Sequence, residues 1–292
     1  MWAMPLEFPR SLAWVAAARG GRDWLGSLPH MVEECVEEWH LVVGAPLPGS
    51  HVSLVMPAVR EDGTRAVLKL NFPHRESEHE GTALAAWEGE GAVRLFAEDR
   101  RRRALLMERC VPGTPLSVIP PDDAVEVLAG LLPRLWKPAS TPPFRSLADE
   151  AAWWRNSMRQ AWTEAGRPLE ARLIDAALDI LASLPGTQGA QVLLHQDLHG
   201  GNVLAAEREP WLVIDPKPLC GEREFGLAPI IRSAELGHSR AAVRRRLDRL
   251  SAELGVDRER ARLWCIAQTV AWSIGGESPP HLHDVARWLL KM

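Results

Sequence analysis

The first forty residues of the chain carry apolar side chains at helical spacing. The positions that recur at intervals of three and four are Met31, Val32, Cys35, Val36 and Trp39. This interval places their side chains on one face of a helix, and we expect that face to pack against a core.

After residue 40 the pattern changes to short apolar runs that are typical of strands. Strands are predicted at 41–44, 53–59, 65–70, 92–96 and 104–109. The Asp62-Gly63 step between the second and third runs suits a tight hairpin turn, and a helix is predicted over 75–87. The pattern therefore indicates a small unit of five antiparallel strands and one helix.

Beyond residue 110 the chain has mostly helical periodicity. A segment rich in Pro and Gly at 111–115 is typical of a linker. Helices are predicted at 122–136, 147–164 and 169–184 and again from Phe225 to the end, around three short strands at 192–195, 203–205 and 211–215. We therefore expect an α+β protein with two domains, 1–110 and 111–292.

Composition and charge limit the classes of partner. With 34 basic and 38 acidic residues the net charge is -4, which gives no general attraction to nucleic acid or to anionic membranes. Charged residues interrupt every apolar stretch before the roughly 20 residues that span a bilayer. The four cysteines form no Cys-x-x-Cys pair and the chain opens without a signal-peptide pattern, so we expect a cytoplasmic protein. The oligomeric state stays open.

The polar run after the strand at 192–195 carries the pattern most informative about chemistry. Asp197 follows this strand, Asn202 comes five residues later, and Asp215 ends the apolar run at 211–215. A loop carboxylate can accept the proton of an attacking hydroxyl, while amide and carboxylate oxygens suit Mg²⁺. The pattern indicates phosphoryl transfer, with Asp197 as the base and Asn202 and Asp215 as metal ligands.

Two strings in this region carry a family resemblance. The H-x-D-x-x-x-x-N string from His195 to Asn202 and the Asp-Pro-Lys-Pro string that begins at Asp215 resemble the streptomycin 6-kinase and hydroxyurea phosphotransferase branch of the aminoglycoside phosphotransferases. The resemblance runs from about Leu41 to the last helices. It implies a two-lobed, protein-kinase-like fold with a five-stranded N-terminal lobe, a mostly helical C-terminal lobe, and ATP and Mg²⁺ between them.

The resemblance also implies a nucleotide site in the first domain. Such kinases place a strand Lys on the ATP phosphates and hold it with a helical Glu. Lys69 and Glu80 occupy the matching positions. Glu76 lies on the same predicted helix face, but the residues around Glu80 resemble the family more closely.

The fifth predicted strand resembles the hinge that receives adenine. The backbone groups of Glu108 and Cys110 would meet the base, with Met107 behind it. This assignment completes the nucleotide site that the resemblance implies.

Two segments depart from the family pattern. Residues 44–51 lie where a phosphate-covering loop belongs but lack the G-x-G-x-x-G spacing of protein kinases. Gly226 stands where relatives commonly carry an Asp. We expect that a hydrogen bond ordering the loop after the metal site is missing, with altered substrate choice or lower activity as the result.

The chain has little room for a peptide substrate. About nine residues separate Asp215 from the next predicted helix, and no Ala-Pro-Glu element follows, which favours a small acceptor. Carboxylates should line the site of a cationic acceptor, and the candidates are Glu222, Glu224, Glu235 and Glu277. We predict an ATP-dependent kinase that phosphorylates a hydroxyl of an aminoglycoside-like, streptomycin-type antibiotic.

Other interpretations stay open. The acceptor could be hydroxyurea, a sugar or an amino alcohol, or the chain could be a pseudokinase that binds nucleotide and acts as a regulator. His195 and His199 with Asp197 could instead bind a metal. Hydrolase-type zinc sites need a third or fourth ligand nearby, and none follows in the sequence. The four Arg at 100–103 are more typical of a solvated hairpin tip than of a nucleic-acid site.

Overall fold

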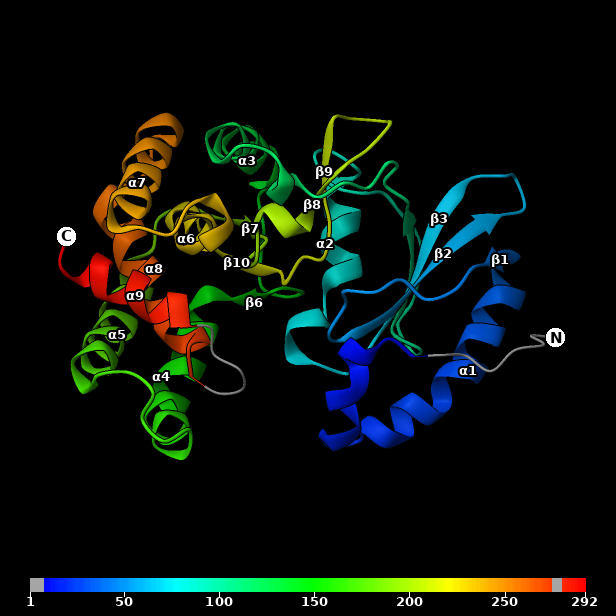
Figure 1. The fold of residues 1–292 in the computed structure, drawn as a ribbon, viewed down its shortest axis with the longest axis horizontal. Coiled ribbons are helices and arrows are strands. Elements are labelled where there is room, and N and C mark those ends of the chain that lie inside the picture. The colour runs from blue at the N-terminus through cyan, green and yellow to red at the C-terminus, as the bar shows by residue number, and fades with distance from the viewer. Residues whose placement is uncertain (1–7, 275–279) are drawn as a thin grey trace. The chain divides into compact units, whose positions relative to one another are not determined.

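The computed structural model describes residues 8–274 and 280–292, and the chain forms two compact units (Figure 1). The first unit comprises Met1–Gly113 with Ala206–Arg208, and the second comprises Thr114–Ala205 with Glu209–Met292. The division into two functional domains predicted from the sequence, 1–110 and 111–292, stays a prediction.

The first unit is built on an antiparallel sheet with the strand order β1-β2-β3-β5-β4. Its strands are β1 (Leu41–Val43), β2 (Ser53–Arg60), β3 (Arg65–Asn71), β4 (Leu95–Asp99) and β5 (Ala104–Glu108). Its helices are the 3-10 helices η1 (Arg10–Ala17) and η2 (Arg75–Ser77) and the α-helices α1 (Gly21–Glu38) and α2 (Glu80–Trp87). The predicted unit of five antiparallel strands and a helix is confirmed.

Alternation along β3 decides what each face of the sheet contacts. Leu68 and Leu70 are buried in a core cluster that also contains Val32 of α1. Successive side chains of a strand point to opposite faces, so Lys69 points away from this core. Figure 1 shows α1 and α2 on opposite sides of the sheet. The side chain of Lys69 therefore points toward α2.

The second unit is mostly helical. Its α-helices are α3 (Pro121–Leu135), α4 (Leu147–Glu164), α5 (Ala171–Ser183), α6 (Ala228–Arg232), α7 (Arg240–Leu254), α8 (Arg258–Trp272) and α9 (Pro280–Leu290). Its 3-10 helices are η3 (Leu116–Val118), η4 (Pro185–Thr187), η5 (Gly200–Asn202), η6 (Arg223–Leu227) and η7 (Ala234–Leu236). Helix α8 is buried at consecutive positions from Trp264 to Val270, which is typical of a helix surrounded by others. It contacts α5, α6, α7 and α9.

Short strands in the second unit carry the loops of interest. The strands β6 (Arg145–Ser146), β7 (Gln191–Leu194) and β10 (Leu219–Glu222) form a sheet in the order β6-β10-β7, and β8 (Val203–Ala205) pairs with β9 (Trp211–Val213). A sheet unit followed by a helical unit confirms the predicted α+β class.

Some predicted elements differ from the structure. The helix predicted over 75–87 is divided, because the His74 side chain caps η2 and α2 begins only at Glu80. The strand predicted at 92–96 starts later, as β4. Strand β10 was not predicted, because Pro216 and Pro218 precede it and its apolar run is short.

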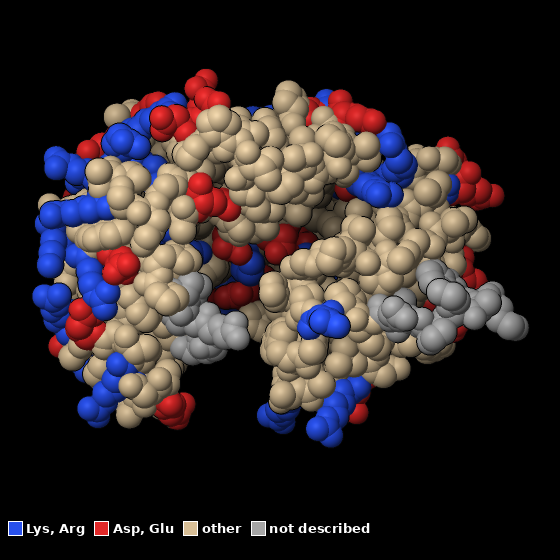
Figure 2. Space-filling view, in the orientation of Figure 1, with Lys and Arg blue, Asp and Glu red and all other residues tan. Residues whose placement is uncertain are grey.

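The surface of the second unit is rich in paired charges. Basic side chains gather over the part where α7 lies (Figure 2). Arg249 pairs with Glu253 at 2.7 Å and Arg258 with Asp248 at 2.6 Å, as in an ordinary solvated surface. Within the described ranges, we find no helix with the length and apolar character that a membrane crossing needs.

Candidate active site

Lys69 is held in the first unit by a buried chain of polar side chains. Its Nζ donates to Glu80 Oε1 at 2.7 Å, and Asn71 Nδ2 donates to Glu80 Oε2 at 2.8 Å. Ser53 Oγ in turn donates to Asn71 Oδ1 at 2.6 Å. Lys69 is 5% exposed and Glu80 is 1% exposed. The two residues expected to cooperate are therefore in direct contact, away from bulk water.

Local structure explains why these four side chains form a hydrogen-bonded series. Glu80 is the first residue of α2, where the helix dipole favours a carboxylate. Ser53 and Asn71 lie directly opposite each other in the β2–β3 pair, and a buried ion pair is stable only when its remaining polar atoms are satisfied. Sequence reasoning missed Asn71 and Ser53, although extending the register from the Asp62-Gly63 turn would have paired them.

Glu76 has different surroundings. It lies in η2, and its N–H donates to His74 Nδ1 at 3.3 Å. Lys69 donates to Glu80, and the preference for Glu80 over Glu76 stays a prediction.

The hinge residues lie at and just after the end of β5. Met107 and Cys110 are buried, and burial raises the pKa of the Cys110 thiol to about 12, so this thiol is a neutral packing group. The N–H of Glu108 donates to Arg94 O at 2.8 Å. Of the two backbone groups of Glu108, only the carbonyl could therefore bind adenine.

The Glu108 side chain contacts Arg208, which sequence reasoning missed. Arg208 Nη2 lies 2.8 Å from Glu108 Oε2, and Arg208 Nε lies 2.9 Å from Glu108 Oε1. This fork geometry is the strong, orientation-specific form of an Arg–carboxylate pair. It fixes the end of β5.

The loop at 44–51 is tied to the N-terminal 3-10 helix. Ser11 Oγ donates to Ser50 O at 2.5 Å, and Trp14 Nε1 donates to His51 O at 2.7 Å. Two hydrogen bonds from η1 thus position this loop, which lacks the glycine spacing of protein kinases.

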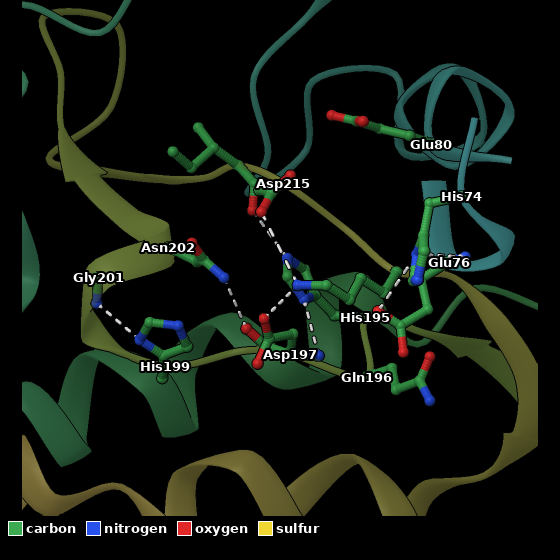
Figure 3. Close-up of polar contacts among 12 residues, drawn as sticks. His74, Glu76, Glu80, His195, Gln196, Asp197, His199, Gly201, Asn202 and Asp215 are labelled. Atoms are coloured by element: carbon green, nitrogen blue, oxygen red, sulfur yellow. Dashed lines mark hydrogen bonds and ion pairs between the residues drawn. The ribbon is translucent and has the colours of Figure 1, made fainter. Parts of the chain in front are cut away.

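His195 links the two loops that carry Asp197 and Asp215 (Figure 3). Its Nδ1 accepts a hydrogen bond from the Asp197 N–H at 3.3 Å, and its Nε2 donates to Ile214 O at 2.9 Å. Burial lowers the pKa of His195 to about 4, and a neutral ring has the one donor and one acceptor used here. His195 acts as a structural link, with both ring nitrogens engaged by the backbone.

The carboxylate of Asp197 faces two cations. Lys217 Nζ donates to Asp197 Oδ2, and Arg232 Nη2 lies 3.5 Å from Asp197 Oδ1. Burial alone would raise the pKa of Asp197, but Lys217 and Arg232 outweigh burial and lower the pKa. The carboxylate therefore stays ionised at neutral pH. Sequence reasoning gave neither cation a role.

Asn202 and Asp215 lie at neighbouring ends of the β8–β9 hairpin (Figure 3). The Ile214 N–H donates to Asn202 O at 3.0 Å, and Asn202 Nδ2 donates to Asp197 O at 2.9 Å. The second bond turns the amide nitrogen toward the Asp197 loop, so the amide oxygen is the atom able to bind a cation. Asp215 has a φ of 55°, which Asp tolerates better than most residues and which is often found at functional sites.

This donor set fits Mg²⁺. The ion prefers oxygen ligands and usually takes only one or two from the protein, with phosphate oxygens and water completing its shell. The amide oxygen of Asn202 and the carboxylate of Asp215 are both of this type.

A pocket of about 270 Å³ in the second unit is lined by Asp197, Glu235, Arg232 and Trp272, among others. Glu235 Oε1 accepts a hydrogen bond from the Gly200 N–H. Burial would raise the pKa of Glu235, but His199 and the Gly200 N–H lower it. The pocket therefore combines two ionised carboxylates, the cation of Arg232 and an aromatic wall.

The other acidic candidates have different surroundings. Glu222 is 1% exposed, and its carboxylate binds Arg260 at 2.7 Å and the indole N–H of Trp264. Glu224 Oε1 accepts from the Asp257 N–H at 3.3 Å, at the start of α8. Glu277 lies outside the described residues. Of the three that are described, only Glu235 lines the pocket that contains Asp197.

A buried arginine fixes the segment that carries Arg232 and Glu235. The guanidinium of Arg246 in α7 donates to the carbonyl oxygens of Ile231 at 2.7 Å and Leu236 at 2.6 Å. Burial lowers its pKa to about 10, so it stays charged at neutral pH. Arg246 thereby positions one wall of the pocket.

Gly226 lies in η6 against an apolar wall. A Cβ atom at this position would lie 3.4 Å from both Leu194 Cδ2 and Trp136 Nε1. Trp136 Nε1 is buried and has no hydrogen-bond partner among the described residues. A carboxylate at position 226 would offer this indole an acceptor, which the glycine lacks.

Comparison with known proteins decides the family. The model of the aminoglycoside/hydroxyurea antibiotic resistance kinases matches residues 38–275, a span that includes Lys69, Asp197 and Asp215. The chain belongs to this kinase family. The assignment confirms the family resemblance and the prediction of an enzyme that transfers phosphate to an alcohol group.

Individual relatives support the same family, and this kinase is similar to two of them over most of its length. It is 40% identical over 282 residues to a streptomycin 6-kinase from Streptomyces glaucescens, covering 92% of this chain and 91% of that one. It is 42% identical over 278 residues to a hydroxyurea phosphotransferase from Kitasatospora aureofaciens, covering 91% and 78%.

A solved structure shows the shared fold. The choline kinase LicA from Streptococcus pneumoniae, which has also been solved in complex with AMP, superposes on this kinase with a TM-score of 0.64 at 13% sequence identity. The match covers 90% of this chain and 98% of that one. The protein-kinase-like fold is thereby confirmed.

Proposed function

We propose that this kinase transfers the γ-phosphate of ATP to a hydroxyl of an aminoglycoside-like, streptomycin-type antibiotic. The observation that carries the proposal is the ionised carboxylate of Asp197 on the wall of a pocket, linked through His195 to the loop of Asp215. Membership of the kinase family and the 40% identity to a streptomycin 6-kinase support it.

In the second unit, the proposed tasks divide between a base and a metal site. Asp197 accepts the proton of the acceptor hydroxyl as its oxygen attacks the γ-phosphorus. Asn202 and Asp215 would hold Mg²⁺, which when bound offsets the negative charge of the phosphates.

In the first unit, the proposed tasks concern the nucleotide. Lys69, held by Glu80, binds the ATP phosphates, and its rigid placement supports this role. The carbonyl of Glu108, the backbone of Cys110 and the side chain of Met107 would receive adenine. Because the reaction uses ATP, we propose that the protein acts in the cytoplasm.

The pocket supports a cationic acceptor over a small neutral one. The ionised carboxylate of Glu235 attracts a cationic group, whereas the charge of Asp197 is already balanced by Lys217 and Arg232. Arg232 lies over the Trp272 ring at 4.4 Å, which shows that this ring accepts a guanidinium surface. A volume of about 270 Å³ is just below the usual range for sites that enclose drug-sized ligands, and it exceeds what a molecule the size of urea fills. We propose Glu235 as the acidic acceptor contact and do not extend that role to the buried Glu222.

Hydroxyurea is the second candidate acceptor. The 42% identity to a hydroxyurea phosphotransferase favours it. The two acceptors differ in charge and size, so the Glu235→Gln variant separates them: a cationic acceptor should lose affinity, while hydroxyurea should not.

The test is an ADP-release assay with Mg²⁺, ATP and one acceptor at a time, using streptomycin, other aminocyclitols and hydroxyurea. We expect release with a streptomycin-type acceptor that depends on Asp197, with Asp197→Asn inactive. The control is Asp175→Asn on the surface of α5, where Asp175 pairs only with the exposed Arg159 at 2.7 Å among the contacts described. ATP binding without acceptor-dependent ADP release would favour a pseudokinase and refute the proposal.

A further inference from the structure

Lys217 lies between the carboxylates of Asp197 and Asp215. Its Nζ hydrogen-bonds Asp197 Oδ2 and lies 3.9 Å from Asp215 Oδ2. The centroid of the Trp272 ring lies 5.9 Å from the same nitrogen. Figure 3 shows the carboxyl groups of Asp197 and Asp215 directed toward the space between their two loops. The ammonium therefore lies between the proposed base and one of the proposed metal ligands.

The backbone of Lys217 is fixed by the same scaffold that positions the carboxylates. Its N–H donates to His195 O at 3.0 Å, and the flanking Pro216 and Pro218 restrict the backbone on both sides. Its side chain is 19% exposed. Holding a long side chain in one conformation costs entropy, so this placement differs from that of an ordinary surface lysine.

Charge balance at Asp197 alone does not account for this placement. Arg232 already reaches Asp197 at 3.5 Å, and it lies over the Trp272 ring at 4.4 Å. Lys217 instead spans both carboxylates, one proposed to receive a proton and the other to hold a metal. A phosphoryl group that moved from a metal ion at Asp215 to a hydroxyl at Asp197 would therefore pass close to the Lys217 ammonium.

We propose that Lys217 is a catalytic residue that donates a hydrogen bond to a γ-phosphoryl oxygen during transfer. The inference rests on the proposed function. In this step the acceptor oxygen bonds to the γ-phosphorus, the bond from that phosphorus to the β,γ-bridging oxygen breaks, and its electron pair leaves with ADP. The acceptor proton passes to Asp197. Lys217 keeps its protons and stabilises the charge on the oxygens in flight.

The experiment compares Lys217→Met with wild type and with Lys291→Met, a control at the exposed C-terminal end of the chain. We expect Lys217→Met to lower kcat by about 10²–10³-fold, the usual effect of removing one such donor. The melting temperature and the affinity for ADP should stay near wild type. Lys217→Arg keeps the charge and should retain more activity than Lys217→Met.

A second readout separates catalysis from structure. In Lys217→Ala, added methylammonium should restore part of kcat, which it would not do if the residue only stabilised the fold. A wild-type enzyme that turns over an acceptor while Lys217→Met keeps kcat within about threefold would overturn this inference alone. A wild-type enzyme that phosphorylates no acceptor would overturn the proposed function, and this inference with it.

Discussion

The two units each hold a lysine against carboxylates, but in opposite settings. Lys69 and Glu80 are almost completely buried, and both carboxylate oxygens of Glu80 are engaged by Lys69 and Asn71. In the second unit Asp197 is 13% exposed and Lys217 is 19% exposed. The first pair is fixed as part of a folded core, whereas the second lies where small molecules can reach it.

This difference indicates a division of labour. A buried pair positions one cation rigidly, because separating it would leave a charge in a medium of low dielectric. The second pair keeps some exposure, and Asp197 has a second cation, Arg232, at 3.5 Å, so Lys217 can turn to a substrate without leaving this carboxylate unpaired. The first pair should therefore respond to mutation mainly through stability, and the second mainly through turnover.

The largest effect is expected from Asp197→Asn. It removes the proposed base and should lower kcat by about 10²–10⁴-fold, while the free energy of unfolding changes little because the side chain keeps its shape. Steady-state kinetics and thermal melting measure the two quantities. Loss of stability with retained turnover would contradict the claim that the second unit's pair acts mainly in turnover.

Glu80→Ala should give the largest loss of stability. Removing the carboxylate takes away an ion-pair partner of buried Lys69, and breaking such a pair costs about 3–5 kcal/mol. Adding Lys69→Met should restore much of that loss, since the buried charge is then gone as well. Denaturant unfolding of the single and double variants gives the coupling energy, and additive losses would contradict the account.

His195 tests the comparison within the second unit, because it is buried beside the accessible pair and should affect stability. Its pKa is about 4 when folded against 6.5 when unfolded, so the unfolded chain binds the proton more tightly. Stability should therefore be full above pH 6.5 and fall as the pH drops toward 4, by up to about 3 kcal/mol. His195→Gln should flatten this part of the unfolding profile, and parallel profiles would argue against a neutral buried ring.

The smallest effect is expected from Glu235→Gln. The amide keeps an acceptor for the Gly200 N–H but loses the charge, so KM for a cationic acceptor should rise about tenfold while kcat changes little. Glu224→Gln, which alters a carboxylate bound at the start of α8, is the matched control. Equal KM values for both variants would remove Glu235 from the acceptor site.

Much of the fold was predictable because its elements have local signals. The apolar run of β3 and the hairpin at Asp62-Gly63 specify the strand that carries Lys69, which is the central strand of the sheet. The helix at Leu147–Glu164 was predicted to the residue. The split of the helix before Glu80 was missed, because it depends on the His74 side chain capping a turn.

The candidate site was predictable where motif spacing encodes it and not where distant segments meet. Asp197, Asn202 and Asp215 lie within one continuous stretch of the sequence. The contact of Arg232 with Asp197, and of Arg208 with Glu108, depends on chain segments that only the folded structure brings together. Lys217 belongs to the Asp-Pro-Lys-Pro motif, but this motif alone does not show that the side chain of Lys217 turns back to Asp197.

The most direct test of the central claim is to identify the product by ³¹P NMR after incubation of streptomycin with ATP and Mg²⁺. We predict a new phosphate monoester on the acceptor with wild-type enzyme and none with Asp215→Ala. An ester formed equally well by Asp215→Ala, or free phosphate as the only product of the wild-type enzyme, would contradict the account.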